Sequence, residues 1–194
     1  MSLVNIPPVI FMDAFLTSTV AVTLAEIGDK TQLLTLLLVS RFRKHIALIL
    51  GILTATLLNH ALSAWLGQII GSLMSPETGN LILGLSFVAM GIWLLVPDQE
   101  EGVSTRFDHL GAFWVTTILF FLAEMGDKTQ VATVLLAAEY QSVIWVTAGT
   151  TLGMLLANLP VIYLGRKLLD ITPVRTVQII ASLLFILLGV VTLW

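Results

Sequence analysis

The chain has 194 residues, of which 57% are hydrophobic and only 11% are charged, and its formal net charge is −3. Soluble domains carry about 25% charged residues, so this composition excludes a water-exposed globule and predicts an all-α, polytopic membrane protein. The absence of cysteine excludes disulfides, thiolate metal sites and cysteine nucleophiles. No basic run indicates a nucleic-acid partner.

Six apolar stretches follow one another along the chain, each at least as long as the roughly 17–25 residues that a transmembrane helix needs. We place them at 10–39, 45–71, 79–96, 110–138, 143–165 and 175–194. The first and fourth exceed a perpendicular span, and tilting, a kink at Gly28 or Gly126, or a break into half-helices would each accommodate the excess. Residues 1–12 contain no Lys or Arg, so they lack the basic start of a signal peptide and the first stretch is expected to be retained.

The basic residues predict the orientation of the six helices. Apart from Lys30 and Lys128, they lie in the first, third and fifth connections: Arg41, Arg43, Lys44, Arg106, Arg166, Lys167 and Arg175. Six helices place these three connections on one side of the membrane and both termini on the other. Because basic connections remain in the cytoplasm, both termini are expected outside it.

The chain is internally duplicated. At a constant offset of 98 residues, the octet at 25–32 (AEIGDKTQ) falls on the octet at 123–130 (AEMGDKTQ), and Gly51 falls on Gly149. Each half holds three helices, an odd number, so the two copies cross the membrane in opposite directions. We therefore predict two inverted three-helix repeats, 1–97 and 109–194, joined by an acidic cytoplasmic linker at 98–108. This architecture is typical of secondary transporters with a binding site at the repeat interface.

The duplicated octet places ionisable residues inside apolar stretches, where each charge costs at least about 2.5–3.5 kcal/mol. The acids are Glu26, Asp29, Glu124 and Asp127, and the lysines are Lys30 and Lys128. On a helix, positions i, i+3 and i+4 share a face, so each set is expected to cluster. If both sets meet, four carboxylates and two ammonium groups leave a formal charge of −2, which one divalent cation would neutralise. We therefore predict that the four acids bind a metal.

Oxygen ligands without cysteine suit Mg²⁺, Ca²⁺ or Mn²⁺, carried as the transported substrate rather than held as a cofactor. Gln32 and Gln130 are expected nearer the acids than Thr31 and Thr129, so we favour the glutamines as auxiliary groups, while the lysines offset charge in the empty state. Grouped carboxylates also suit exchange of the metal for protons. The partners predicted are the lipid bilayer, a divalent cation and protons.

Other interpretations remain open. Each Glu–Lys pair could be an i,i+4 salt bridge that only joins helices. His60 aligns with Asn158, beside Asn59, and these residues either complete the site or form interhelical hydrogen bonds. A cation channel with an acidic ring is a second class of function. A membrane-embedded enzyme is disfavoured, because no nucleophilic set accompanies the acids.

The doubled E-x-G-D-K-T motif resembles the signature of the Golgi-type calcium/manganese exchanger family, whose relatives include chloroplast-envelope transporters and bacterial manganese exporters. The resemblance covers the whole chain. It implies export of Mn²⁺ or Ca²⁺ from the cytoplasm, in exchange for protons, with the ion bound by Glu26, Asp29, Glu124 and Asp127. The short connections resemble those of a bacterial member in the inner membrane, which favours Mn²⁺. A Ca²⁺/H⁺ exchanger of the same architecture is the nearest alternative.

Overall fold

In the computed structural model, which describes residues 8–96 and 108–194, every regular element of the described residues is helical. The first half forms α1 (Pro8–Glu26), α2 (Lys30–Phe42), α3 (His45–Ser72) and α4 (Pro76–Trp93). The second half forms the 3-10 helix η1 (Asp108–Leu110), α5 (Gly111–Glu124), α6 (Lys128–Tyr140), α7 (Val143–Leu164), α8 (Arg166–Ile171) and α9 (Val174–Leu193). The prediction of an all-α fold is confirmed for these residues. The predicted linker, except for Asp108, lies outside them.

The helix boundaries decide among the options left open for the long first and fourth stretches. Both are broken at the duplicated motif, and α1 and α2 meet at an angle of 72° across the first break. Residues 166–173, which lie between the fifth and sixth predicted stretches, contain the short helix α8, which the sequence did not indicate. Its single turn and a half is too short for hydrophobic periodicity to indicate a helix.

Three helices of the described part, α3, α7 and α9, are long and apolar enough to cross a membrane, and α1 with α2 makes a fourth if the bent pair is counted as one span. This agrees with a membrane protein. By length and composition the remaining helices do not reach the threshold for a span, so the six-span inverted repeat stays a prediction.

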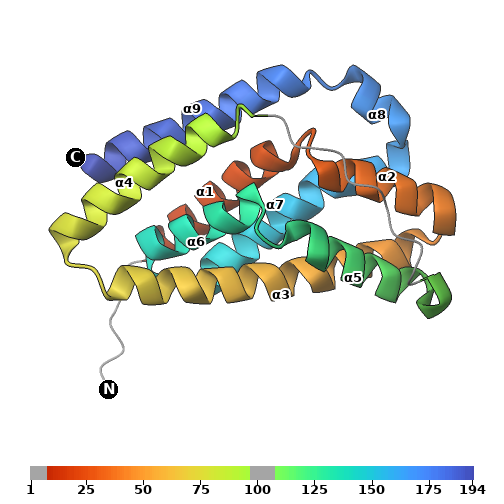
Figure 1. Ribbon diagram of the computed structural model, residues 1–194, viewed down its shortest axis with the longest axis horizontal. Helices are drawn as coiled ribbons and strands as arrows, with labels where there is room; N and C mark the ends of the chain where they lie inside the picture. Colours follow the sequence, from red (N-terminus) through yellow and green to blue (C-terminus); the bar gives the residue numbers. More distant parts are fainter. Residues whose placement is uncertain (1–7, 97–107) are drawn as a thin grey trace.

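The two halves interlock, because the long helix of each half packs on the broken helix pair of the other half (Figure 1). Helix α7 lies along α1 and α2, and α3 lies correspondingly along α5 and α6, while α4 packs on α9. A Cβ at Gly149 of α7 would lie 2.5 Å from the carbonyl oxygen of Phe15, and a Cβ at Gly51 of α3 would lie 2.9 Å from that of Phe113. These pairs are separated by the same 98 residues. Glycine at both crossings lets the backbones approach closely, which brings the two motif breaks together.

Candidate metal-binding site

The duplicated motif forms two helix breaks with the same construction. The chain leaves α1 after Glu26 and α5 after Glu124, and it turns at Gly28 (φ +84°) and Gly126 (φ +76°), a conformation that favours glycine. The backbone N–H of Gly28 donates to Gln32 Oε1 at 2.9 Å, and the N–H of Gly126 donates to Gln130 Oε1 at 2.6 Å. The glutamines therefore hold the breaks closed.

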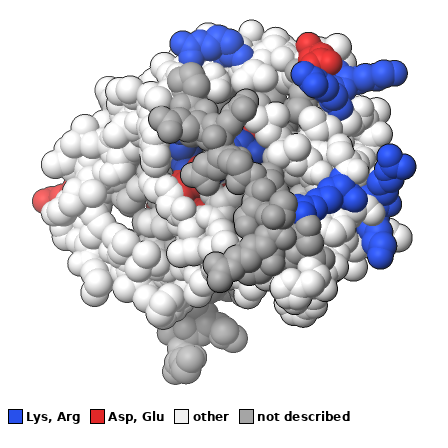
Figure 2. All heavy atoms as spheres, turned by 45° about the vertical axis from the view of Figure 1, so that its right-hand side comes forward, with Lys and Arg blue, Asp and Glu red and all other residues white. Residues whose placement is uncertain are grey.

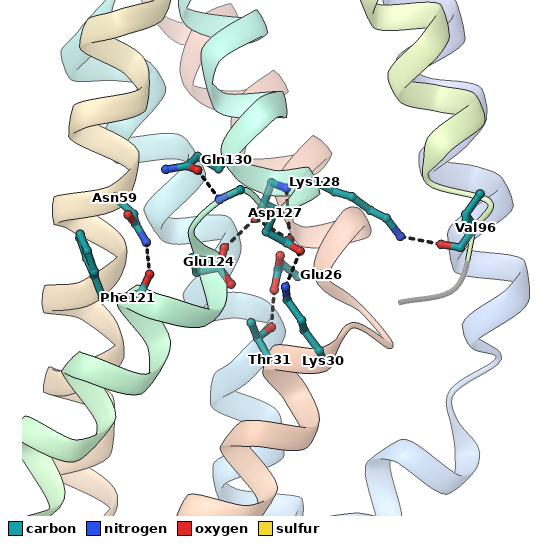
Figure 3. A network of polar contacts seen from close by, with 12 residues as sticks. Glu26, Lys30, Thr31, Asn59, Val96, Phe121, Glu124, Asp127, Lys128 and Gln130 are labelled. Atoms are coloured by element: carbon teal, nitrogen blue, oxygen red, sulfur yellow. Dashed lines mark hydrogen bonds and ion pairs between the residues drawn. The ribbon is translucent and has the colours of Figure 1, made fainter. Parts of the chain in front are cut away.

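The breaks bring three carboxylates together, as Figure 3 shows. One oxygen from each of Glu26, Glu124 and Asp127 lies within 4.8 Å of the others. The two glutamates are fully buried and Asp127 is 5% exposed. Oxygens on opposite sides of a bound Ca²⁺ are about 4.6–5.2 Å apart, so one cation would contact all three groups. Asp29, also buried and at the start of α2, does not belong to this group of three.

Each buried glutamate is held through only one of its two oxygens. Thr31 donates its hydroxyl to Glu26 Oε2, and Thr129 donates its hydroxyl to Glu124 Oε2 at 2.7 Å. Within the described residues, Oε1 of both glutamates has no hydrogen-bond partner. Burying a carboxylate oxygen without a partner costs free energy. A bound cation would offset this cost while the carboxylate stays ionised.

The prediction that Gln32 and Gln130 lie nearer the acids than the threonines is wrong, because the threonines contact the glutamates. That prediction assumed a continuous helix, in which the angular position of each residue is fixed. Because the chain turns at the glycines, the threonine hydroxyls reach the glutamates and the glutamine oxygens turn back to the backbone.

Among the described residues, Lys30 forms its ion pair with Asp127 and not with Glu26, the i,i+4 partner that the salt-bridge alternative required. Lys30 Nζ lies 2.9 Å from Asp127 Oδ1, so the ion pair joins the two halves of the chain. Lys128 donates to the carbonyl oxygen of Val96 at 2.6 Å, just beyond α4 (Figure 3). With Lys30 included, the three carboxylates carry a formal charge of −2, the complement of one divalent cation.

The polar residues on α3 and α7 support the breaks. Asn59 donates to the carbonyl oxygen of Phe121 at 3.0 Å, an acceptor near the end of α5 that the break leaves without its helical partner. Asn158 accepts from the Thr35 hydroxyl at 2.7 Å. For Asn59 and Asn158 the hydrogen-bonding interpretation is confirmed. His60 is fully buried, and neither ring nitrogen has a partner among the described residues.

Two contacts at the site were missed by sequence reasoning. The carbonyl oxygen of Ala157 accepts from the Gln32 amide at 2.8 Å, and that of Val96 accepts from Lys128. Both acceptors are backbone atoms, which every residue type offers, so no sequence signal could have indicated them.

Comparison with known proteins finds similarity along most of the chain. The model of the family described as "Divalent cation/proton antiporter GDT1" matches residues 14–102 and 112–194. A Vibrio cholerae protein named "Putative manganese exporter" is 48% identical over 185 residues, which cover 93% of this chain and 90% of the relative. GDT1-like protein 3 of rice is 30% identical over 90% of this chain and 71% of its own length. GDT1-like protein sll0615 of Synechocystis is 28% identical, over 94% and 98%. No solved structure matches.

Proposed function

The chain belongs to the GDT1 family of divalent cation/proton antiporters, and from that premise we propose that it exports Mn²⁺ from the cytoplasm in exchange for protons. It is a membrane transporter and not an enzyme. The choice of Mn²⁺ over Ca²⁺ and the direction of transport are the parts that we add. They are suggested by the name of the Vibrio cholerae relative and by a site built from oxygen ligands, which suits Mn²⁺ as well as Ca²⁺.

One observation carries the proposed site. Two fully buried glutamates from opposite halves of the chain each keep one oxygen on a threonine hydroxyl and leave the other without a partner in the described part, beside Asp127. We assign Glu26, Glu124 and Asp127 as ligands of the cation in this arrangement. Asp29, the counterpart of Asp127 in the first half, is proposed as the fourth.

Lys30 connects the site to proton exchange. In the present arrangement its ammonium group pairs with Asp127 at 2.9 Å, so it competes with a metal for that carboxylate. When the cation leaves, protons and the ammonium group together compensate the remaining negative charge, since carboxylates in close contact favour protonation. Antiport follows because the same oxygens hold either the metal or protons, but not both at once.

We further propose that six segments cross the inner membrane of a bacterium as two inverted repeats, with both termini outside the cytoplasm. Figure 2 turns the end of the molecule where α2 meets α3 and where α8 lies partly toward the reader, and most of its blue Lys and Arg side chains lie along the top and right of this view. Arg43, Lys44, Arg166 and Lys167 belong to these connections. Their position at one end supports a cytoplasmic assignment of that end.

The test is uptake of Mn²⁺ and of Ca²⁺ into proteoliposomes with an imposed pH gradient. Native protein is compared with Asp29→Asn and Asp127→Asn. Asp170→Asn is the control, because Asp170 is an exposed acid on α8 that pairs with Arg166 of the same helix. We expect gradient-dependent Mn²⁺ flux that is lost in the first two variants and kept in the control.

Three other outcomes change the conclusion. Preference for Ca²⁺ would replace the ion and keep the mechanism. Flux that does not saturate and ignores the pH gradient would indicate a channel. Flux that survives both Asp29→Asn and Asp127→Asn would place the transport path elsewhere.

A further inference from the structure

A second site is indicated at the end of the molecule that carries the basic connections. There the turn between α2 and α3 borders an open cavity of about 770 Å³. Its lining combines the cations of Arg43 and Lys44 with the apolar side chains of Ile46 and Leu50 and the ring of Tyr163. None of these residues contributes to the carboxylate site.

The cavity lies where two membrane-crossing helices end. Helix α3 begins at His45 and α7 ends at Leu164, and both are long and apolar enough to span a bilayer. The rings of His45 and Tyr163 meet edge to face with their centroids 5.6 Å apart, which fixes these two ends side by side. Since each helix leaves the hydrocarbon at its end, the cavity lies at the level of the lipid headgroups.

The order of chemical groups in the cavity matches that of a phospholipid. Arg43 and Lys44 are exposed, and within the described part of the chain neither forms an ion pair. Ile46, in the first turn of α3, is 75% exposed, and Leu50, about one turn later, is 48% exposed. Cations at the helix end, followed by an apolar wall, suit a phosphate followed by an acyl chain. A free inorganic anion would use only the cations.

The second half of the chain has the same turn without the charges. Arg43 and Gln141 are separated by the repeat offset of 98 residues, and both have φ +49° as the residue that ends a helix, α2 or α6. Lys44 corresponds to Ser142. The backbone of the turn therefore does not require basic residues. The positive-inside rule favours the cations at this end, and the exposed apolar residues beside them are what a lipid site adds.

We propose that this cavity binds an anionic phospholipid, with the phosphate between Arg43 and Lys44 and an acyl chain along Ile46 and Leu50. Basic pockets between membrane helices hold anionic headgroups by this combination of charge and apolar contact. Because the site lies at the end of the molecule that carries the basic connections, the transporter binds this lipid from one leaflet.

The proposal is tested by native mass spectrometry of the purified full chain in detergent, titrated with phosphatidylglycerol and with phosphatidylcholine. The variant Arg43→Gln with Lys44→Ser gives the turn the residues that its counterpart at 141 and 142 already carries, so its fold is preserved. Arg166→Gln with Lys167→Ser removes the same charge from α8 and is the matched control. Each basic residue near the membrane surface strengthens the binding of an anionic lipid by about fivefold. Loss of both predicts a roughly 25-fold weaker affinity for phosphatidylglycerol in the first variant, with little change in the control.

A second variant tests the apolar part of the site. Leu50→Gln keeps both cations, and it should weaken binding of phosphatidylglycerol several-fold if an acyl chain lies along α3. Equal losses in the two charge variants, equal affinity of the native protein for phosphatidylcholine, or displacement of phosphatidylglycerol by inorganic phosphate would overturn the proposal.

Discussion

Replacing Thr129 with valine tests whether the threonine hydroxyls position the carboxylates for the cation. Thr129 is 1% exposed, and its hydroxyl donates to Glu124 Oε2 at 2.7 Å, which is the hydrogen bond that holds this buried side chain. Valine has nearly the same shape and lacks the donor. The substitution therefore leaves the packing intact and releases the carboxylate from its fixed orientation.

The expected size of the effect follows from the shorter contact of this hydroxyl, to Glu124, because Asp127 Oδ2 at 3.4 Å competes for the same proton. A hydrogen bond to a charged group contributes about 1.5–3 kcal/mol, which corresponds to a factor of roughly 10 to 150 in binding. Loss of a group that orients a metal ligand typically lowers affinity by about 10- to 100-fold. We expect the KM for Mn²⁺ to rise by about one to two orders of magnitude in Thr129→Val.

The assay is the initial rate of Mn²⁺ uptake into proteoliposomes as a function of Mn²⁺ concentration. Thr129→Ser retains a hydroxyl and should restore most of the affinity. Thr133→Val removes a hydroxyl that donates to the Thr129 carbonyl oxygen, one turn away, and should change the KM little. An unchanged KM in Thr129→Val, or an equal rise in Thr133→Val, would refute the reasoning.

Three further predictions use the same proteins. Gly126→Ala should lower the melting temperature in detergent by a few degrees, since the left-handed backbone costs an L-residue about 1–2 kcal/mol. Gly28→Ala should lower it more, because its Cβ would also collide with Val174. Equal shifts in the two variants would contradict this. Lys30→Gln should bind Mn²⁺ more tightly in a thermal-shift titration yet transport it more slowly, since the ammonium group no longer competes with the metal for Asp127. Weaker binding of Mn²⁺ would contradict this competition. Mn²⁺ at 100 times its Kd should stabilise the native protein by about 2.7 kcal/mol, and Glu124→Gln should lose this shift.

Hydrophobic composition and the duplicated motif were enough to predict a helical membrane protein and its family. Both are properties of the chain itself, because apolar length indicates a span and a gapless repeat of a charged octet is visible without coordinates. The positions of most helices followed within a few residues. Helix α8 did not, since a short element carries no periodic signal.

The sequence by itself also determined which residue types occupy the site, because glutamates, aspartates and lysines inside apolar stretches are energetically costly and mark functional positions. Only the tertiary structure decided how they are used. Whether the long stretches bend or break depends on glycine φ values that packing selects, and the break turned the threonines rather than the glutamines toward the glutamates. The pairing of Lys30 with Asp127 joins residues 97 positions apart, and helical periodicity describes only neighbours within one helix. Contacts between the two halves arise from the interlocking of α3 and α7 with the opposite motifs, which only the folded chain contains.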